Sequence, residues 1–146
     1  MKSLILLVLM TIALPLGAEE TVAPAARVDA TYFHRTFRCQ TCLQIEDMAR
    51  YAVEMERAEA VEAGHLTWRA VNFEEEEVAG VADEYGLESP TLVLALVVGG
   101  EVVKSRRLEK TWDLYGDAEK FDAYVLGAVD EFLKAASASG TRPESE

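Results

Sequence analysis

Two cysteines, Cys39 and Cys42, are the only ones in this chain, and they are separated by two residues. They follow an apolar pair, Tyr32 and Phe33, and precede a long amphipathic pattern, so we expect them where a strand leads into the first turn of a helix. Unpaired backbone N–H groups and the positive end of the helix dipole stabilise a thiolate there, and lower a cysteine pKa from about 8.5 into the range of about 3.5 to 7.5. The pair therefore favours thiol–disulfide exchange, with Cys39 as the exposed nucleophile, Cys42 as the resolving thiol, and a reversible disulfide between them.

Two other uses of the cysteine pair remain open. A disulfide that closes over two intervening residues removes little entropy from the unfolded chain, which disfavours a purely structural bond in a non-catalytic interaction domain. Two thiolates also suit soft ions such as Cu(I), so a soft-metal or metalloid binding protein is the main alternative. A structural zinc site would need two more ligands, and only His34 and His65 are available, at the wrong spacing. We therefore assign no metal site.

The N-terminal residues form a pattern typical of export. Lys2 provides a positive start, residues 4–14 are an apolar run, and small residues lead up to Ala18, which together predict a signal peptide over residues 1–18. The run is shorter than the roughly 20 apolar residues that span a bilayer comfortably. We expect an exported protein, located in the bacterial periplasm. Membrane anchoring through an uncleaved N-terminal segment is the alternative.

Length and charge limit the remaining possibilities. A chain of 146 residues, 50% of them hydrophobic, predicts one domain, which we place at residues 28–136 between a linker (19–27) and a disordered polar tail (137–146). The net charge of −12 excludes nucleic acid as a partner, because phosphate binding requires clustered Lys and Arg. We expect a monomer whose partners are protein or small-molecule thiols and disulfides.

Periodicity and turn signals predict the order of elements: strand, helix, strand, helix, two strands joined by a hairpin at Gly99-Gly100, and a last helix capped by Asp117. The acidic run at residues 74–77 is expected to be the solvated first turn of the second helix. The predicted strands cover residues 28–34, 66–73, 91–98 and 101–108, and the first two helices cover 42–63 and 74–85.

A βαβ unit followed by ββα, with a C-x-x-C pair opening the first helix, resembles the thioredoxin fold. Ser89 and Pro90 before a buried strand, and two glycines after it, reinforce the resemblance, which covers roughly residues 28–134. It implies an α/β fold with a four-stranded mixed sheet flanked by helices. It also implies that Pro90 is cis and that Ser89 and Pro90 form the groove that binds an incoming peptide or thiol.

A closer resemblance involves several short stretches. Residues 32–42 (YFHRTFRCQTC), together with Glu46, Ala49-Arg50, residues 112–114 (WDL) and residues 121–125 (FDAYV), are similar to the small thioredoxin-like family labelled nitrophenyl compound nitroreductase subunit ArsF. This resemblance implies the fold and the cysteine pair. It does not imply nitroreduction, because the chain has no glycine-rich dinucleotide fingerprint and nothing that resembles a flavin site. We therefore expect no cofactor.

The sequence also departs from thioredoxins near the cysteines. Thioredoxins carry Trp before the first cysteine, Gly-Pro between the two, and a buried acid on the first strand. Here the corresponding residues are Arg38, Gln40-Thr41 and Phe33. Efficient general disulfide reduction is therefore not implied, and the direction of exchange stays open. A reductant acting outside the cytosol would also require a membrane electron donor as a partner.

Three basic residues precede the cysteine pair. His34, Arg35 and Arg38 are candidate modulating residues, because positive charge near Cys39 would favour its thiolate. The alternative is that they are ordinary surface or turn residues whose charge the solvent screens.

Overall fold

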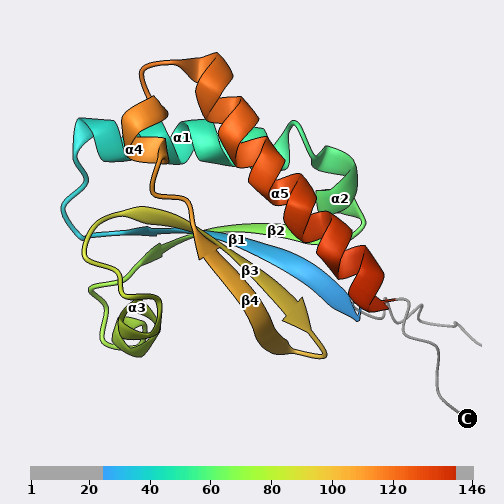
Figure 1. Ribbon diagram of the computed structural model, residues 1–146. Helices are drawn as coiled ribbons and strands as arrows, with labels where there is room; N and C mark the ends of the chain where they lie inside the picture. Colours follow the sequence, from blue (N-terminus) through green and yellow to red (C-terminus); the bar gives the residue numbers. More distant parts are fainter. Residues whose placement is uncertain (1–24, 141–146) are drawn as a thin grey trace, which may run out of the picture.

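The computed structural model describes residues 25–140, which form four strands and five helices (Figure 1). Residues 1–24 and 141–146, which include the predicted signal peptide, lie outside the described residues. The elements are β1 (Ala26–His34), α1 (Gln40–Glu54), α2 (Ala58–Glu62), β2 (Leu66–Asn72), α3 (Ala79–Tyr85), β3 (Thr91–Val98), β4 (Glu101–Arg107), α4 (Thr111–Leu114) and α5 (Ala118–Gly140). No helix within the described range is both long and apolar enough to cross a membrane.

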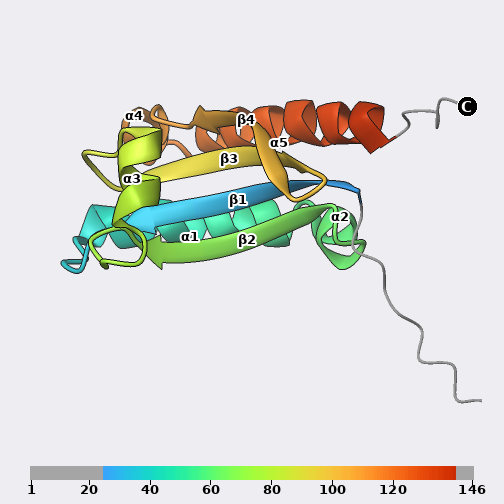
Figure 2. The ribbon, with the colours of Figure 1, turned by 90° about the horizontal axis from the view of Figure 1, so that it is seen from below.

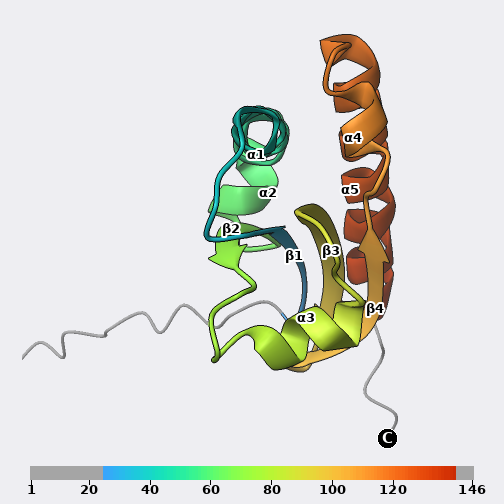
Figure 3. The same ribbon diagram turned by 90° about the vertical axis from the view of Figure 1, so that its left-hand side faces the viewer.

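The four strands form one mixed sheet in the order β2-β1-β3-β4. β1 is parallel to β2 and antiparallel to β3, and β4 returns antiparallel to β3 after the hairpin. Helices α1 and α5 cover one face of the sheet, and α3 lies against the other face (Figures 1 and 3). This is the four-stranded α/β arrangement of the thioredoxin-like fold, as the sequence predicted.

The two central strands supply the core. Alternate side chains of β1 point to opposite faces: Tyr32 packs with α1 and α5, whereas Phe33 packs toward α3. β3 is covered on one face by α1 and α5 and on the other by α3, so its residues are buried on both faces, which explains its nearly continuous apolar sequence. Seen from below, β1 and β3 run through the middle of the molecule (Figure 2). The C-terminal end of β1, which leads to the cysteines, is therefore paired with β2 on one side and with β3 on the other.

The single helix predicted over residues 42–63 is wrong, because the chain breaks into α1 and α2. Arg57 leaves the helical conformation (φ −127°, ψ 33°). Its guanidinium donates two hydrogen bonds of 2.7 Å to the Asp130 carboxylate on α5. Met55, at the break, is 63% exposed, so the apolar face does not continue through it. The bidentate pair stabilises the turn between the two short helices.

The predicted helix over residues 74–85 also begins later than expected, at Ala79. The acidic residues 74–77 form turns, and the Glu74 carboxylate accepts a 2.9 Å hydrogen bond from the Thr36 backbone N–H instead of occupying a helix terminus. Helix α5 extends to Gly140, four residues into the segment predicted to be disordered, because Ala136 continues its buried stripe. The Asp117 cap is confirmed by a 3.2 Å bond that its carboxylate accepts from the Lys120 N–H.

Candidate redox site

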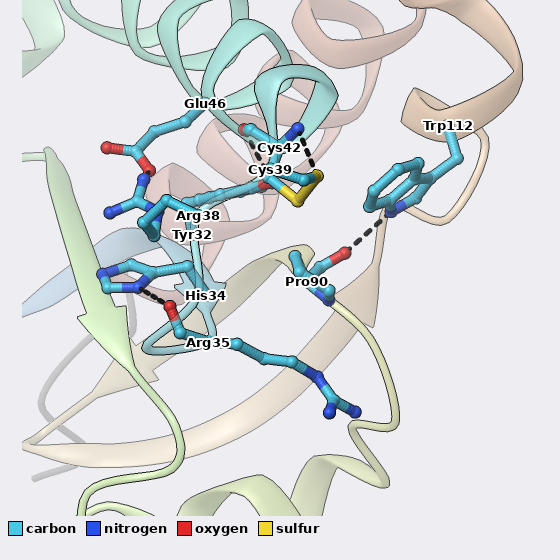
Figure 4. Close-up of a disulfide and its surroundings, with 9 residues drawn as sticks. All are labelled: Tyr32, His34, Arg35, Arg38, Cys39, Cys42, Glu46, Pro90 and Trp112. Carbon is cyan, nitrogen blue, oxygen red and sulfur yellow. Dashed lines mark hydrogen bonds and ion pairs between the residues drawn. A yellow bond between two sulfur atoms is a disulfide. The ribbon is translucent and has the colours of Figure 1, made fainter.

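Cys39 and Cys42 form a disulfide at the start of α1 (Figure 4). Cys39 is the N-cap residue: its Sγ accepts a 3.0 Å hydrogen bond from the Cys42 N–H, and its carbonyl accepts one of 3.0 Å from the Leu43 N–H. The sulfur therefore occupies the position that a capping oxygen takes in other helices. After reduction, a thiolate at this position would be stabilised by the same N–H group and by the helix dipole.

The two cysteines differ in how deeply they are buried. Cys42 is buried, with 5% of its surface exposed, whereas Cys39 is partly exposed. A partner can therefore approach Cys39 from solvent but reaches Cys42 only through Cys39 or after a movement of the helix start. The assignment of Cys39 as the attacking thiol and Cys42 as the resolving thiol stays a prediction, and this difference in burial bears on it.

Tyr32 lies beneath the cysteine pair and connects β1 to α1. Its hydroxyl donates a 3.0 Å hydrogen bond to the Cys42 carbonyl, and the side chain is fully buried. Burial raises the pKa of Tyr32 well above its usual value; the negative charge of Glu46 adds to the shift, and Arg38 opposes it. The phenol thus stays protonated at physiological pH and remains a donor to the first turn of α1.

Arg38 points away from the sulfurs and forms an ion pair with Glu46, which lies one turn after Cys42 (Figure 4). The exposed fractions of the two side chains are 28% and 16%, so the pair is largely shielded from water. The Nε of Arg38 is buried and has no hydrogen-bond partner among the described residues. The positive charge expected near Cys39 is therefore largely offset by a carboxylate.

The Arg35 and His34 side chains interact with groups other than the cysteines. The Arg35 guanidinium donates to the Glu88 carbonyl, lies 3.6 Å from the Glu74 carboxylate, and stacks over the Phe73 ring at 5.5 Å. The ring Nδ1 of His34 lies 3.0 Å from the Arg35 carbonyl oxygen. Within residues 25–140, neither side chain makes a hydrogen bond to a cysteine sulfur.

Pro90 lies close to the disulfide and is buried, whereas Ser89 is exposed (Figure 4). No peptide bond in the described part of the chain is cis, so the prediction of a cis Pro90 was wrong. Trans is the preferred form of an X-Pro bond by about 0.5 to 1 kcal/mol, and the residue before a strand tolerates proline without a change of isomer. The groove assigned to Ser89 and Pro90 stays a prediction.

Trp112 of α4 is a site residue that the sequence did not reveal, since we treated it only as a core or interface residue. Its indole N–H donates a 2.8 Å hydrogen bond to the Pro90 carbonyl, and the half-buried side chain lies to one side of Pro90 and the disulfide (Figure 4). A buried indole usually requires an acceptor, but no sequence pattern indicates which carbonyl it will find.

No group of three or more His, Cys, Asp or Glu side chains that could hold a metal ion occurs among the described residues. A soft ion bound at this site would therefore depend on the two cysteine thiolates after reduction of the disulfide.

Solved structures similar to this chain include two thioredoxins. One is from Fasciola hepatica, with 19% identity and a TM-score of 0.35, and the match covers 65% of this chain and 81% of that one. The other is Malassezia sympodialis thioredoxin (Mala s 13), with 16% identity and a TM-score of 0.38, covering 70% of this chain and 81% of that one. No protein-family model and no curated protein match the sequence. The fold assignment rests on the strand order and helix placement described above.

Proposed function

We propose that this protein of thioredoxin-like fold carries out thiol–disulfide exchange through Cys39 and Cys42. One observation supports the proposal most directly: the sulfur of Cys39, a partly exposed residue, caps α1, while its partner Cys42 is buried. A disulfide that served only as a staple would gain nothing from a partly exposed cysteine at a helix N-terminus. An exchange site requires both features.

The exchange consists of two substitutions at sulfur. In the reduced protein the Cys39 thiolate attacks a partner disulfide, forms a mixed disulfide and releases one partner thiolate. The Cys42 thiol then loses its proton to solvent and attacks the Cys39 sulfur, which re-forms the Cys39–Cys42 bond and releases the second partner thiolate. The partner gains two electrons, and a dithiol donor must return them to this protein. The reverse sequence oxidises a dithiol partner.

Trapping of mixed disulfides tests this mechanism. Cys42→Ser should accumulate adducts with partner thiols, seen as slower bands on non-reducing gels that disappear on reduction, because the resolving step is lost. Cys39→Ser should give none, since the remaining thiol is buried. A matched pair of this kind controls for expression and overall charge. Equal trapping by both variants, or by neither, would contradict the assignment of roles.

We further propose that exchange takes place outside the cytosol, in the bacterial periplasm. Support comes from Lys2, the apolar run at residues 4–14 and the small residues up to Ala18. The electron donor would then be a membrane protein. The ArsF family is the proposed family of relatives, on the strength of residues 32–42 and the other short stretches that resemble it. Fusing residues 1–27 to a reporter that folds only after export tests the location: a cytosolic reporter would refute it.

A further inference from the structure

The face of the sheet against which α3 lies carries polar side chains on a central strand. Alternation along β1 places Asp29, Thr31 and Phe33 on this face, whereas Tyr32 lies on the face that α1 and α5 cover. Asp29 is 8% exposed and Thr31 is 6% exposed, so both are buried. A buried carboxylate is costly unless it is paired, and an apolar residue would pack at this position at lower cost.

Asp29 lies between two guanidinium groups. Its carboxylate accepts hydrogen bonds from the Arg27 Nε at 2.8 Å and Nη2 at 3.3 Å, and from the Thr67 hydroxyl at 2.8 Å. The Arg69 guanidinium is 3.8 Å from the same carboxylate, which is beyond hydrogen-bond distance. The Arg69 side chain is 62% exposed and remains accessible from solvent. Two positive charges therefore face one negative charge, and the cluster has a net positive charge.

A small cavity of about 90 Å³ lies beside this cluster. Helix α3 has seven residues and crosses only one end of this face of the sheet (Figure 1). The cavity lies where α3 meets the strands, and its wall combines polar and apolar side chains. The polar ones are Asp29, Thr31, Arg69 and Tyr85, and the apolar ones are Phe33, Val81, Val93, Ala95 and Val102.

Three of the polar groups have hydrogen-bonding capacity that the protein itself does not use. Within residues 25–140, the hydroxyls of Thr31 and Tyr85 and the guanidinium of Arg69 form no hydrogen bond. Burial raises the pKa of Tyr85, and the negative charge of Glu84 adds to the shift. Asp29 raises this pKa further and Arg69 lowers it, so the phenol lies within range of both charges. It stays protonated at neutral pH and can donate a hydrogen bond.

We propose that this cavity binds a short-chain aliphatic monocarboxylate of about three or four carbon atoms. The Arg69 guanidinium recognises the carboxylate through paired N–H donors, and the hydroxyls of Thr31 and Tyr85 donate to its oxygens. The aliphatic chain contacts the apolar part of the wall. An apolar cavity of about 150 Å³ accommodates benzene, so a cavity of about 90 Å³ limits the ligand to a smaller body.

The charges disfavour other classes of ligand. A cation would meet the guanidiniums of Arg27 and Arg69, and the Asp29 carboxylate already accepts three hydrogen bonds. An uncharged ligand would leave the positive charge of Arg69 without a partner. The cavity is on the opposite face of the sheet from Tyr32, which supports the cysteine pair, so the inference does not depend on the proposed exchange function.

A titration of the full-length oxidised protein, followed by the NMR shifts of its backbone amides at constant ionic strength, tests the inference. The probes are butyrate, its uncharged analogue butyramide, and hexanoate. We expect butyrate to bind saturably with a dissociation constant on the order of 1 to 10 mM, and to shift most strongly the amides of Thr31, Arg69 and Tyr85. Butyramide should bind at least about tenfold more weakly, because it lacks the charge. Hexanoate should bind no more tightly than butyrate, because its chain exceeds the cavity.

Three variants locate the site. Arg69→Gln keeps a polar side chain but removes the charge, and should weaken butyrate binding by about tenfold or more. Tyr85→Phe removes one donor and keeps the ring, and should weaken binding by about two- to tenfold. Arg106→Gln is the matched control, because Arg106 pairs with Glu131 of α5 on the other face of the sheet. It should leave the dissociation constant unchanged, and amide shifts far from the cavity report whether each variant keeps the fold.

Four results would overturn the inference. Butyrate could show no saturable binding up to about 100 mM. Butyramide could bind as tightly as butyrate, which would exclude recognition of the carboxylate. The shifted amides could lie away from the cavity. Finally, Arg69→Gln and Arg106→Gln could weaken binding equally, which would indicate a general attraction of anions to arginine side chains instead of a site.

Discussion

The hydrogen bond from Tyr32 to the Cys42 carbonyl offers a sharp test of how the sheet supports the cysteine pair. Tyr32→Phe removes only the hydroxyl and keeps the buried ring, so the packing of β1 against α1 is preserved. A hydrogen bond of this kind contributes about 0.5 to 1.5 kcal/mol net, and we expect the free energy of unfolding to fall by about 1 kcal/mol.

Urea unfolding of the oxidised protein measures this loss. With a slope of about 1 to 3 kcal/mol per molar urea, the midpoint should fall by roughly 0.3 to 1 M. Tyr51→Phe is the matched control, because Tyr51 lies on the same helix but is 55% exposed, and its midpoint should be nearly unchanged. Equal effects of the two substitutions would refute the view that the Tyr32 hydroxyl supports the first turn of α1.

The same residue gives a pH dependence with a defined sign. Burial raises the pKa of folded Tyr32 above its ordinary value of 10.0, so above about pH 10 the unfolded state loses the phenolic proton while the folded state retains it. The folded protein therefore becomes less stable as the pH rises beyond that point. Tyr32→Phe should reduce the slope of midpoint against pH there, and an unchanged slope would contradict the assignment of the shift to Tyr32.

Two other predictions concern the packing of α5. Phe132→Ala should lower the free energy of unfolding by about 3 to 5 kcal/mol in urea titrations, because the ring is fully buried in the larger core; a loss below about 1 kcal/mol would contradict that position. The hydrogen bond from Arg57 holds the pKa of Asp130 below its usual range, so the stabilisation is present at neutral pH and is lost as the pH falls through the lowered pKa. Asp130→Asn should destabilise by less than about 1 kcal/mol at pH 7 and by less still near pH 2, and an effect that grows toward acid would refute the pairing.

The fold could be predicted from the sequence because the sequence patterns that indicate it are local. The buried strand at residues 91–98, the glycine hairpin after it and the C-x-x-C pair at a helix start each reflect nearest-neighbour chemistry, and the structure confirms all three. Their order along the chain was sufficient to indicate the sheet, because few arrangements accommodate a βαβ unit followed by a hairpin and a helix.

The sequence-based predictions that the structure corrected depend on contacts between residues distant in the sequence. The break after α1 depends on Asp130, 73 residues away from Arg57. The turn at residues 74–77 depends on the Thr36 N–H, and the setting of Pro90 depends on Trp112. None of these partners can be identified from periodicity. The same limitation applied to Arg38. The sequence placed Glu46 on the first helix, but it did not indicate that Glu46 would form an ion pair with Arg38.

The most direct test of the account is the pH dependence of alkylation at each cysteine of the reduced full-length protein, resolved by mass spectrometry between about pH 5 and pH 9. Capping of α1 by Cys39 predicts that this thiol reacts with an apparent pKa well below 8.5, while the buried Cys42 reacts slowly throughout. If both thiols titrated near 8.5, or if Cys42 reacted as fast as Cys39, the site would lack the activated, accessible thiolate on which the proposed exchange depends.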